Sequence, residues 1–191
     1  MTKYILHGGR TSIECEGNRK FFAEITKDSK EPVKILLVYF ARPKAEWNEM
    51  FKQDKINFSS NANGKEVELI LASENTKEFI EQIKNADAIY MRGGNNPDLL
   101  KEKMSQIKNW EELFSGKTIA GSSAGAMILS RYSHSRTDKS QSFEGLGILP
   151  IKVIVHYSQG MKNKSEDLEN YGDEKMKIYA IPETEFIVLN K

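Results

Sequence analysis

The chain has one cysteine, Cys15, so it has no partner for an internal disulfide bond. The acidic neighbours Glu14 and Glu16 disfavour a thiolate, which argues against a reactive thiol at this position. One cysteine also cannot build a cysteine-based zinc site, and the three histidines lack ligand spacing with carboxylates. We therefore expect no metal and no cofactor.

Charge of either sign is not in excess, because 28 Lys and Arg residues stand against 27 Asp and Glu residues. This balance argues against nucleic acid as a partner. No apolar run approaches the ~20 residues that a membrane span requires, and the N-terminus lacks the pattern of a signal peptide. We expect a cytoplasmic protein without membrane contact, folded as one domain over residues 1–191.

Apolar runs alternate with amphipathic stretches along the first two thirds of the chain. The runs predict strands at residues 4–7, 33–40, 67–71, 88–91 and 118–120. Helical spacing of apolar residues predicts helices at 17–28 and 44–57, and further helices capped by Asn75 and Asn96. This alternation predicts an α/β fold with a mostly parallel, doubly wound sheet and helices on both faces. Ligands of such sheets bind beyond the carboxyl ends of the strands.

The last third of the chain has a different pattern. Residues 131–143 are polar without periodicity and predict a loop. A strand is expected at 151–155, followed by a polar stretch that holds one solvated helix. Two short strands, 176–181 and 186–189, are expected to form a hairpin.

Gly121, Ser123 and Gly125 form a G-x-S-x-G pattern between an apolar strand and an apolar helix. This pattern is typical of a nucleophile elbow, in which a sharp turn exposes a serine hydroxyl and small neighbours let the turn close. The N–H of Ala124 would face an oxyanion formed there. The alternative is a glycine-rich turn that only packs a helix against a sheet.

A serine nucleophile needs a base, and three histidines are available. His156 follows an apolar strand at the edge where the elbow opens, which makes it the candidate base. His7 ends the first strand and suits either a site or a packed edge, whereas His134 lies in the polar stretch, where we expect a solvated side chain. Asp138 and Glu144 lie between serine and histidine and are the candidate acids; acids after the histidine, such as Glu183, are weaker candidates.

Four features occur in order: Gly93-Gly94-Asn95 after a strand, the segment from Gly121 to Ala126, the segment from Gly145 to Pro150, and His156. As a set they resemble the peptidase E and cyanophycinase family of serine peptidases. The resemblance implies a three-layer α/β/α sandwich, flavodoxin-like and related to class I glutamine amidotransferases. It also implies hydrolysis of a small peptide, such as a dipeptide, through an acyl-enzyme.

Carried over residue by residue, the resemblance makes Ser123 the nucleophile and His156 the general base. It assigns the oxyanion hole to the N–H groups of Gly94 and Ala124. Asp138 stands where the dipeptidases of the family have a third member of the triad.

Glu144, directly before the Gly145 segment, is a second possibility for the acid. Gly93 and Asn95 are expected to contact the substrate. Residues 157–175 contain no arginine, unlike the aspartyl dipeptidases of the family, so the specificity for a side chain stays open.

Three other functions are compatible with parts of the pattern. His7-Gly8-Gly9 resembles the oxyanion motif of α/β-hydrolase esterases, although that fold usually places its histidine far beyond the serine. A glutaminase would need cysteine in place of Ser123. A catalytically silent member of the same superfold would bind a ligand or partner, and a homodimer through the edge of the sheet is also an expectation.

Overall fold

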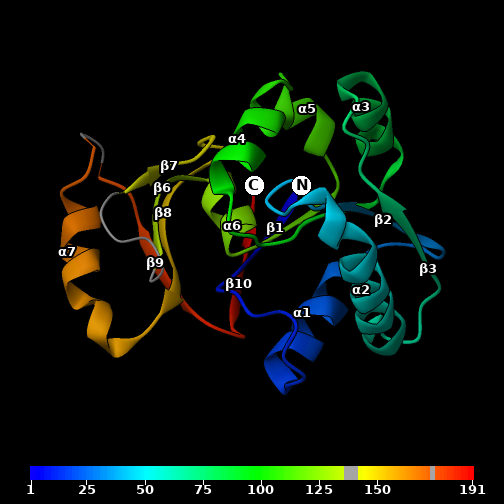
Figure 1. Ribbon diagram of the computed structural model, residues 1–191, viewed down its shortest axis with the longest axis horizontal. Coiled ribbons are helices and arrows are strands. Elements are labelled where there is room, and N and C mark those ends of the chain that lie inside the picture. Colours follow the sequence, from blue (N-terminus) through cyan, green and yellow to red (C-terminus); the bar gives the residue numbers. More distant parts are fainter. Residues whose placement is uncertain (136–141, 173–174) are drawn as a thin grey trace.

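The computed structural model describes residues 1–135, 142–172 and 175–191, and Figure 1 shows their arrangement. A six-stranded sheet contains β1 (Lys3–His7), β2 (Val33–Val38), β3 (Val67–Leu71), β4 (Ala88–Met91), β5 (Thr118–Ser122) and β10 (Phe186–Asn190). Its strand order is β10-β1-β5-β4-β2-β3, and every neighbouring pair is parallel except β10 with β1. The predicted mostly parallel sheet is confirmed.

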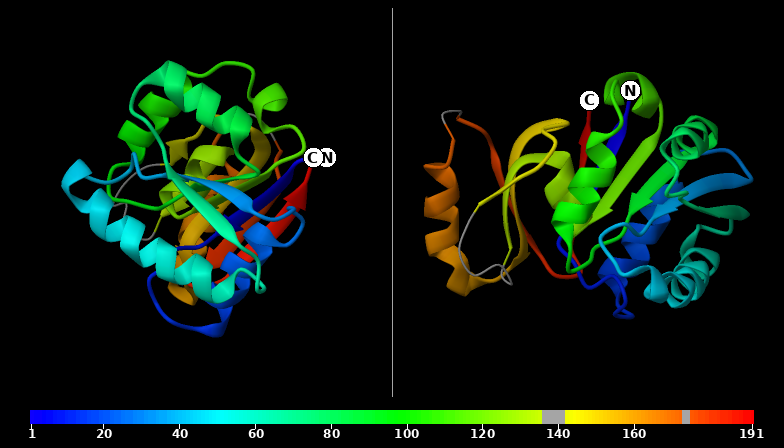
Figure 2. Two further views of the ribbon diagram at one scale, coloured as in Figure 1. Left: turned by 90° about the vertical axis from the view of Figure 1, so that its right-hand side faces the viewer. Right: turned by 45° about the horizontal axis from the view of Figure 1, so that its top comes forward.

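Helices cover both faces of this sheet, which gives the predicted α/β/α layering (Figures 1 and 2). One face carries α1 (Glu16–Thr26) and α2 (Trp47–Asn61), the latter preceded by the short η1 (Lys44–Glu46). The other carries α3 (Thr76–Asn85), α4 (Pro97–Ser105), α5 (Trp110–Phe114) and α6 (Ala124–Leu129). Asn75 and Asn96 cap α3 and α4 as predicted, because their side-chain oxygens accept backbone N–H groups of the first turn.

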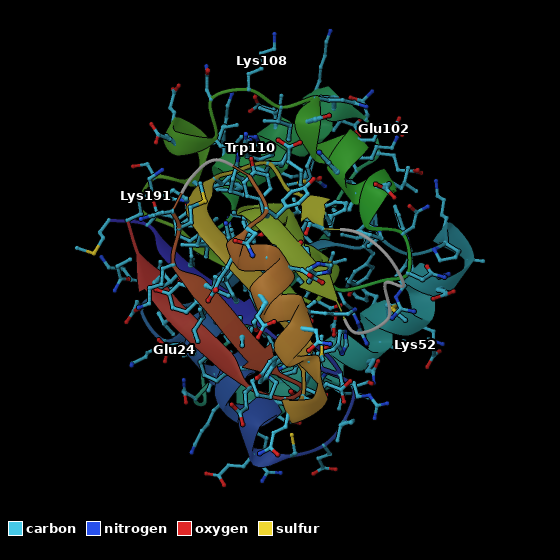
Figure 3. All side chains as sticks on the ribbon, turned by 90° about the vertical axis from the view of Figure 1, so that its left-hand side faces the viewer. Glu24, Lys52, Glu102, Lys108, Trp110 and Lys191 are labelled. Carbon is cyan, nitrogen blue, oxygen red and sulfur yellow. The ribbon has the colours of Figure 1, made fainter. Side chains whose placement is uncertain are left out.

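A second sheet of four strands lies beside α6. It contains β6 (Ser130–Ser135), β7 (Phe143–Glu144), β8 (Leu149–Tyr157) and β9 (Ile178–Pro182), in the order β7-β6-β8-β9. The short η2 (Gln159–Met161) leads into α7 (Lys162–Glu169), which covers the outer face of this sheet and is in front in Figure 3. Helix α6 therefore packs between the two sheets and joins them.

Two predictions for this part of the chain are wrong. The polar stretch from 131 begins as strand β6, which pairs in parallel with β8. The two C-terminal strands do not form a hairpin, because β9 pairs with β8 in the second sheet and β10 returns to β1 in the first. The return brings the chain ends together, as Figure 2 shows, and the Thr2 N–H donates to the Lys191 carbonyl at 2.8 Å.

One apolar core runs through both sheets. Its buried side chains include Ile5 and Leu36 of the first sheet, Ile128 of α6, and Val153 and Ile181 of the second sheet. The elbow and the strand that carries His156 are thus fixed relative to each other by shared packing. Among the described residues, no helix combines the length and the apolar character needed to span a membrane.

Candidate active site

Ser123 is the single residue between β5 and α6, and its backbone is strained. Its φ of 48° and ψ of −112° lie where residues with a Cβ are rarely found. The Ser123 N–H donates to the His7 carbonyl at 2.9 Å, so the end of β1 helps to hold this conformation. A Cβ on Gly125 would lie 2.2 Å from the Met91 carbonyl oxygen, which explains why the elbow helix needs glycine where it crosses β4.

The His156 imidazole lies against this serine, with Nε2 2.8 Å from the Ser123 Oγ. His156 also has a positive φ, 53°, and sits at an irregularity where the register between β8 and β9 shifts. Its N–H leaves the strand ladder and donates to the Gly8 carbonyl at 2.8 Å. Such irregularities re-aim a side chain, and here the ring points across to the first sheet.

The carboxylate on the other side of the ring belongs to Glu183, whose Oε1 is 2.9 Å from His156 Nδ1. The second oxygen, Oε2, is 3.1 Å from the Nε of Arg10. A carboxylate at Nδ1 fixes the tautomer in which Nδ1 carries the proton and Nε2 is free to accept one. Ser123, His156 and Glu183 are thus connected as in a serine–histidine–acid triad.

This arrangement corrects the expectation for Glu144. Its carboxylate lies 3.0 Å from the Nη1 of Arg131 at the exposed end of the second sheet, because Glu144 pairs with Tyr132 in the ladder of β7 and β6. Asp138 lies outside the described residues. Chain order makes Glu183 a weak candidate acid, because it follows His156. In the structure, however, β9 runs parallel to β8, so the end of β9 brings Glu183 beside His156.

The other two histidines have different environments. His7 is fully buried; its Nδ1 accepts the Gly9 N–H at 3.0 Å, and its Nε2 donates to the Asn18 side-chain oxygen at 2.9 Å. Burial lowers the pKa of His7 to about 4, so the ring is neutral near pH 7. His134 was expected to be solvated, but it is a buried residue of β6 with Nε2 3.2 Å from the Ser142 hydroxyl.

The Gly8-Gly9 turn makes room for the imidazole. Gly9 has a φ of +126°, and a Cβ there would lie 2.2 Å from the Cε1 of His156. The backbone of Gly9 therefore packs directly against the ring. The His7-Gly8-Gly9 segment, which resembled an esterase oxyanion motif, here supports the histidine instead.

The turn that follows β4 lies against the elbow. A Cβ on Gly93 would be 2.8 Å from the Ser123 Cβ, and the Gly93 N–H donates to the Ser122 hydroxyl at 3.0 Å. Among the described residues, none accepts a hydrogen bond from the Gly94 N–H. Ala124 is the first residue of α6, so its N–H has no acceptor within the helix. These two amides are the N–H groups that the family resemblance assigns to the oxyanion hole.

A cleft of about 360 Å³ opens over Ser123 and His156. Its wall includes Asn95 and three arginines, Arg10, Arg42 and Arg92. A neighbouring cleft of about 380 Å³ shares Arg42 and Asn95 and extends to Trp47. Across the described ranges 1–135, 142–172 and 175–191, no group of three or more His, Cys, Asp or Glu residues is placed to hold a metal ion.

A family model and two solved structures are similar to this chain. The sequence model of peptidase family S51 matches residues 5–191. The crystal structure of a peptidase from an acI-B1 actinobacterium is similar with a TM-score of 0.68 and 25% identity, over 98% of this chain and 83% of that chain. The structure of a peptidase E candidate from Listeria monocytogenes EGD-e is similar with a TM-score of 0.65 and 19% identity, over 99% of this chain and 94% of that chain. A search of curated proteins finds no significant match.

Proposed function

Because the chain belongs to peptidase family S51 and is therefore a serine-type peptidase, we propose that it hydrolyses a small peptide through an acyl-enzyme on Ser123. The observation that carries this proposal is the hydrogen-bonded series from the Ser123 hydroxyl through His156 to Glu183. In that series the serine has a base within 2.8 Å, and the base has an orienting carboxylate.

The first half of the reaction forms the acyl-enzyme. Ser123 Oγ attacks the carbonyl carbon of the scissile amide while its proton passes to Nε2 of His156. The carbonyl oxygen becomes an oxyanion, which the N–H groups of Gly94 and Ala124 stabilise. The imidazolium then gives its proton to the leaving nitrogen, the C–N bond breaks, and the first product departs as an amine.

The second half returns the enzyme to its starting state. Water attacks the ester carbonyl and gives one proton to His156 Nε2, which then passes a proton to the departing Ser123 Oγ. The second product leaves as a carboxylic acid. Glu183 stays ionised throughout and stabilises the imidazolium that forms in each half.

The cleft supports a small substrate. Its volume of about 360 Å³ is near the lower end for sites that enclose a drug-sized molecule. Arg10 in its wall favours a substrate with a carboxylate close to the scissile bond, a feature that every dipeptide has at its C-terminus.

Replacement of the nucleophile tests the proposal. Ser123→Ala should lose on the order of a millionfold in turnover of X-Leu dipeptides, where X is Asp, Ala, Lys or Leu. It should also fail to react with a fluorophosphonate, which labels an activated serine and not an ordinary one. Ser12→Ala removes another hydroxyl from the same cleft and should leave both signals unchanged.

Three results would contradict the proposal. A folded Ser123→Ala variant that keeps more than about a hundredth of wild-type turnover excludes Ser123 as nucleophile. A wild-type protein that is neither labelled nor active on any dipeptide supports a silent binding protein. A protein that cleaves p-nitrophenyl butyrate but no peptide is an esterase.

A further inference from the structure

Arg42 contacts the backbone of the turn that carries the proposed oxyanion donor. Its Nε donates to the Gly93 carbonyl at 2.9 Å, and its Nη1 is 3.4 Å from the Glu46 carboxylate. The backbone of Arg42 is itself fixed, because its N–H donates to the Tyr39 carbonyl and its carbonyl accepts the Trp47 indole N–H. The guanidinium is therefore held on the far side of the Gly93–Gly94 peptide bond.

The Gly93 carbonyl, which Arg42 holds, and the Gly94 N–H, which the reaction needs, belong to the same peptide bond. The bond is planar and trans, so the C=O of Gly93 and the N–H of Gly94 point in opposite directions. A donor that fixes the Gly93 oxygen therefore also fixes the direction of the Gly94 N–H. Two consecutive glycines would otherwise let this peptide unit rotate through many orientations.

The other polar group of Gly93 is fixed as well. Its N–H donates to the Ser122 hydroxyl at 3.0 Å, which in turn lies 3.4 Å from the buried Tyr90 hydroxyl. Gly93 is thus held at both its N–H and its C=O, while the Gly94 N–H has no acceptor among the residues that the structure describes. A donor kept in place without a partner suits an oxyanion hole, because no reorganisation is needed when the charge forms.

The charge of the guanidinium adds a second effect. A hydrogen bond from a cationic donor is stronger than one between neutral groups, and successive hydrogen bonds through one peptide unit polarise each other. A positive charge at the Gly93 oxygen withdraws electrons from the amide and makes the Gly94 N–H a better donor. The effect reaches the oxyanion without any contact between Arg42 and the substrate.

We propose that Arg42 is a positioning residue that orients and polarises the Gly93–Gly94 peptide of the oxyanion hole. The inference rests on the proposed function, since it assigns a role within that reaction. It predicts a loss in kcat that is the same for acidic and neutral substrates. If Arg42 instead bound a substrate carboxylate in the cleft, its loss would raise KM, and more so for acidic substrates.

The test compares Arg42→Met with wild type on Ala-Leu and Asp-Leu. We expect kcat to fall ~10- to 100-fold, because a misdirected donor forfeits part of the 10²–10³ that one oxyanion donor supplies. KM should change less than about threefold for either dipeptide. In Arg42→Ala, added methylguanidinium should restore kcat, which a purely structural defect would not allow.

Two variants serve as controls. Lys44→Met removes a neighbouring exposed cation that pairs with Glu74, and kcat should stay within about twofold of wild type. Arg42→Lys keeps the charge but loses the rigid fork of donors, so its kcat should lie between those of wild type and Arg42→Met. If circular dichroism shows that Arg42→Met does not fold, the kcat of Arg42→Lys tests the role of Arg42 instead.

The outcomes separate the inference from the function on which it rests. Inactive wild type, or active Ser123→Ala, contradicts the proposed function. An active wild type together with unchanged kcat in both Arg42→Met and Arg42→Lys overturns the role of Arg42 alone. A loss confined to KM, or an equal loss in Lys44→Met, overturns it as well.

Discussion

Replacing Glu183 by glutamine changes one acceptor oxygen into a donor and leaves the shape of the side chain intact. In the structure both carboxylate oxygens are used: Oε1 is 2.9 Å from His156 Nδ1, and Oε2 is 3.1 Å from Arg10 Nε. An amide has only one acceptor oxygen to offer these two N–H groups. The Arg10 N–H cannot lose its proton, whereas the imidazole can change its tautomer.

The conflict should therefore be resolved at the histidine. With the amide oxygen on Arg10, the amide N–H₂ faces Nδ1, which must then accept. The imidazole proton moves to Nε2 and points at the Ser123 Oγ, so the base is lost. A wrong tautomer of this kind costs on the order of 10⁴ in kcat, or about 5 kcal/mol of transition-state stabilisation.

Removing Arg10 as well tests whether it causes the loss of activity in Glu183→Gln. In the double variant Arg10→Met, Glu183→Gln, the amide oxygen no longer has to face residue 10 and can turn to His156 Nδ1. We expect kcat at least ~10-fold above that of Glu183→Gln alone, so the two substitutions should be strongly non-additive. A carboxylate that acted only through its charge would give no such recovery.

The assay is kcat on a dipeptide across pH 5–9, with the fluorophosphonate labelling rate as a second readout. Glu144→Gln is the matched control, because this exposed carboxylate pairs with Arg131, and its kcat should stay within about twofold of wild type. A Glu183→Gln variant within about tenfold of wild type would refute the reasoning. If Asp138→Asn lost activity instead, the acid would be the one that the family resemblance implied.

Two further predictions concern the end of β1. Burial lowers the pKa of His7 to about 4, so between pH 6.5 and 4 the unfolded chain binds a proton that the folded chain does not, and stability falls as the pH falls. Between pH 7 and 5 this loss of stability amounts to about 2 kcal/mol. In urea unfolding, the free energy of unfolding of His7→Gln should therefore change less between these pH values, by that amount. The same pH dependence in His7→Gln and wild type would contradict the burial of a neutral His7. Gly9→Ala places a Cβ 2.2 Å from the His156 ring, which should displace the base and cost about 10² in kcat. Gly64→Ala, where a Cβ meets nothing within 4 Å, is the control, and equal kcat in both variants would contradict the packing argument.

Local patterns carried the prediction of the first sheet. The strand expected at 67–71 has those bounds in the structure, and the strands expected at 33–40 and 88–91 are found at Val33–Val38 and Ala88–Met91. Parallel strands that are buried on both faces are continuously apolar, so short-range sequence is enough to find them. Caps such as Asn96 act within one turn of their own helix and are predictable for the same reason.

The parts that were missed depend on contacts between distant segments. Glu183 reaches His156 only because β9 pairs in parallel with β8, and no periodicity in the sequence indicates that pairing. The mostly polar side chains of β6 predict a loop, although Ser133 and His134 are buried in the second sheet. Neither the parallel pairing nor the burial of polar side chains can be read from composition.

The end of β1 explains how two strained residues on different sheets keep one geometry. Ser123 and His156 both have positive φ, and such conformations cost of order 1–3 kcal/mol each unless their surroundings hold them. Consecutive carbonyls hold them here: the His7 carbonyl accepts the Ser123 N–H, and the Gly8 carbonyl accepts the His156 N–H. Gly9 then leaves the space that the imidazole occupies. The distance of 2.8 Å between hydroxyl and imidazole is therefore set by three adjacent residues, and substitutions in them should affect turnover even though none donates or accepts a proton in the reaction.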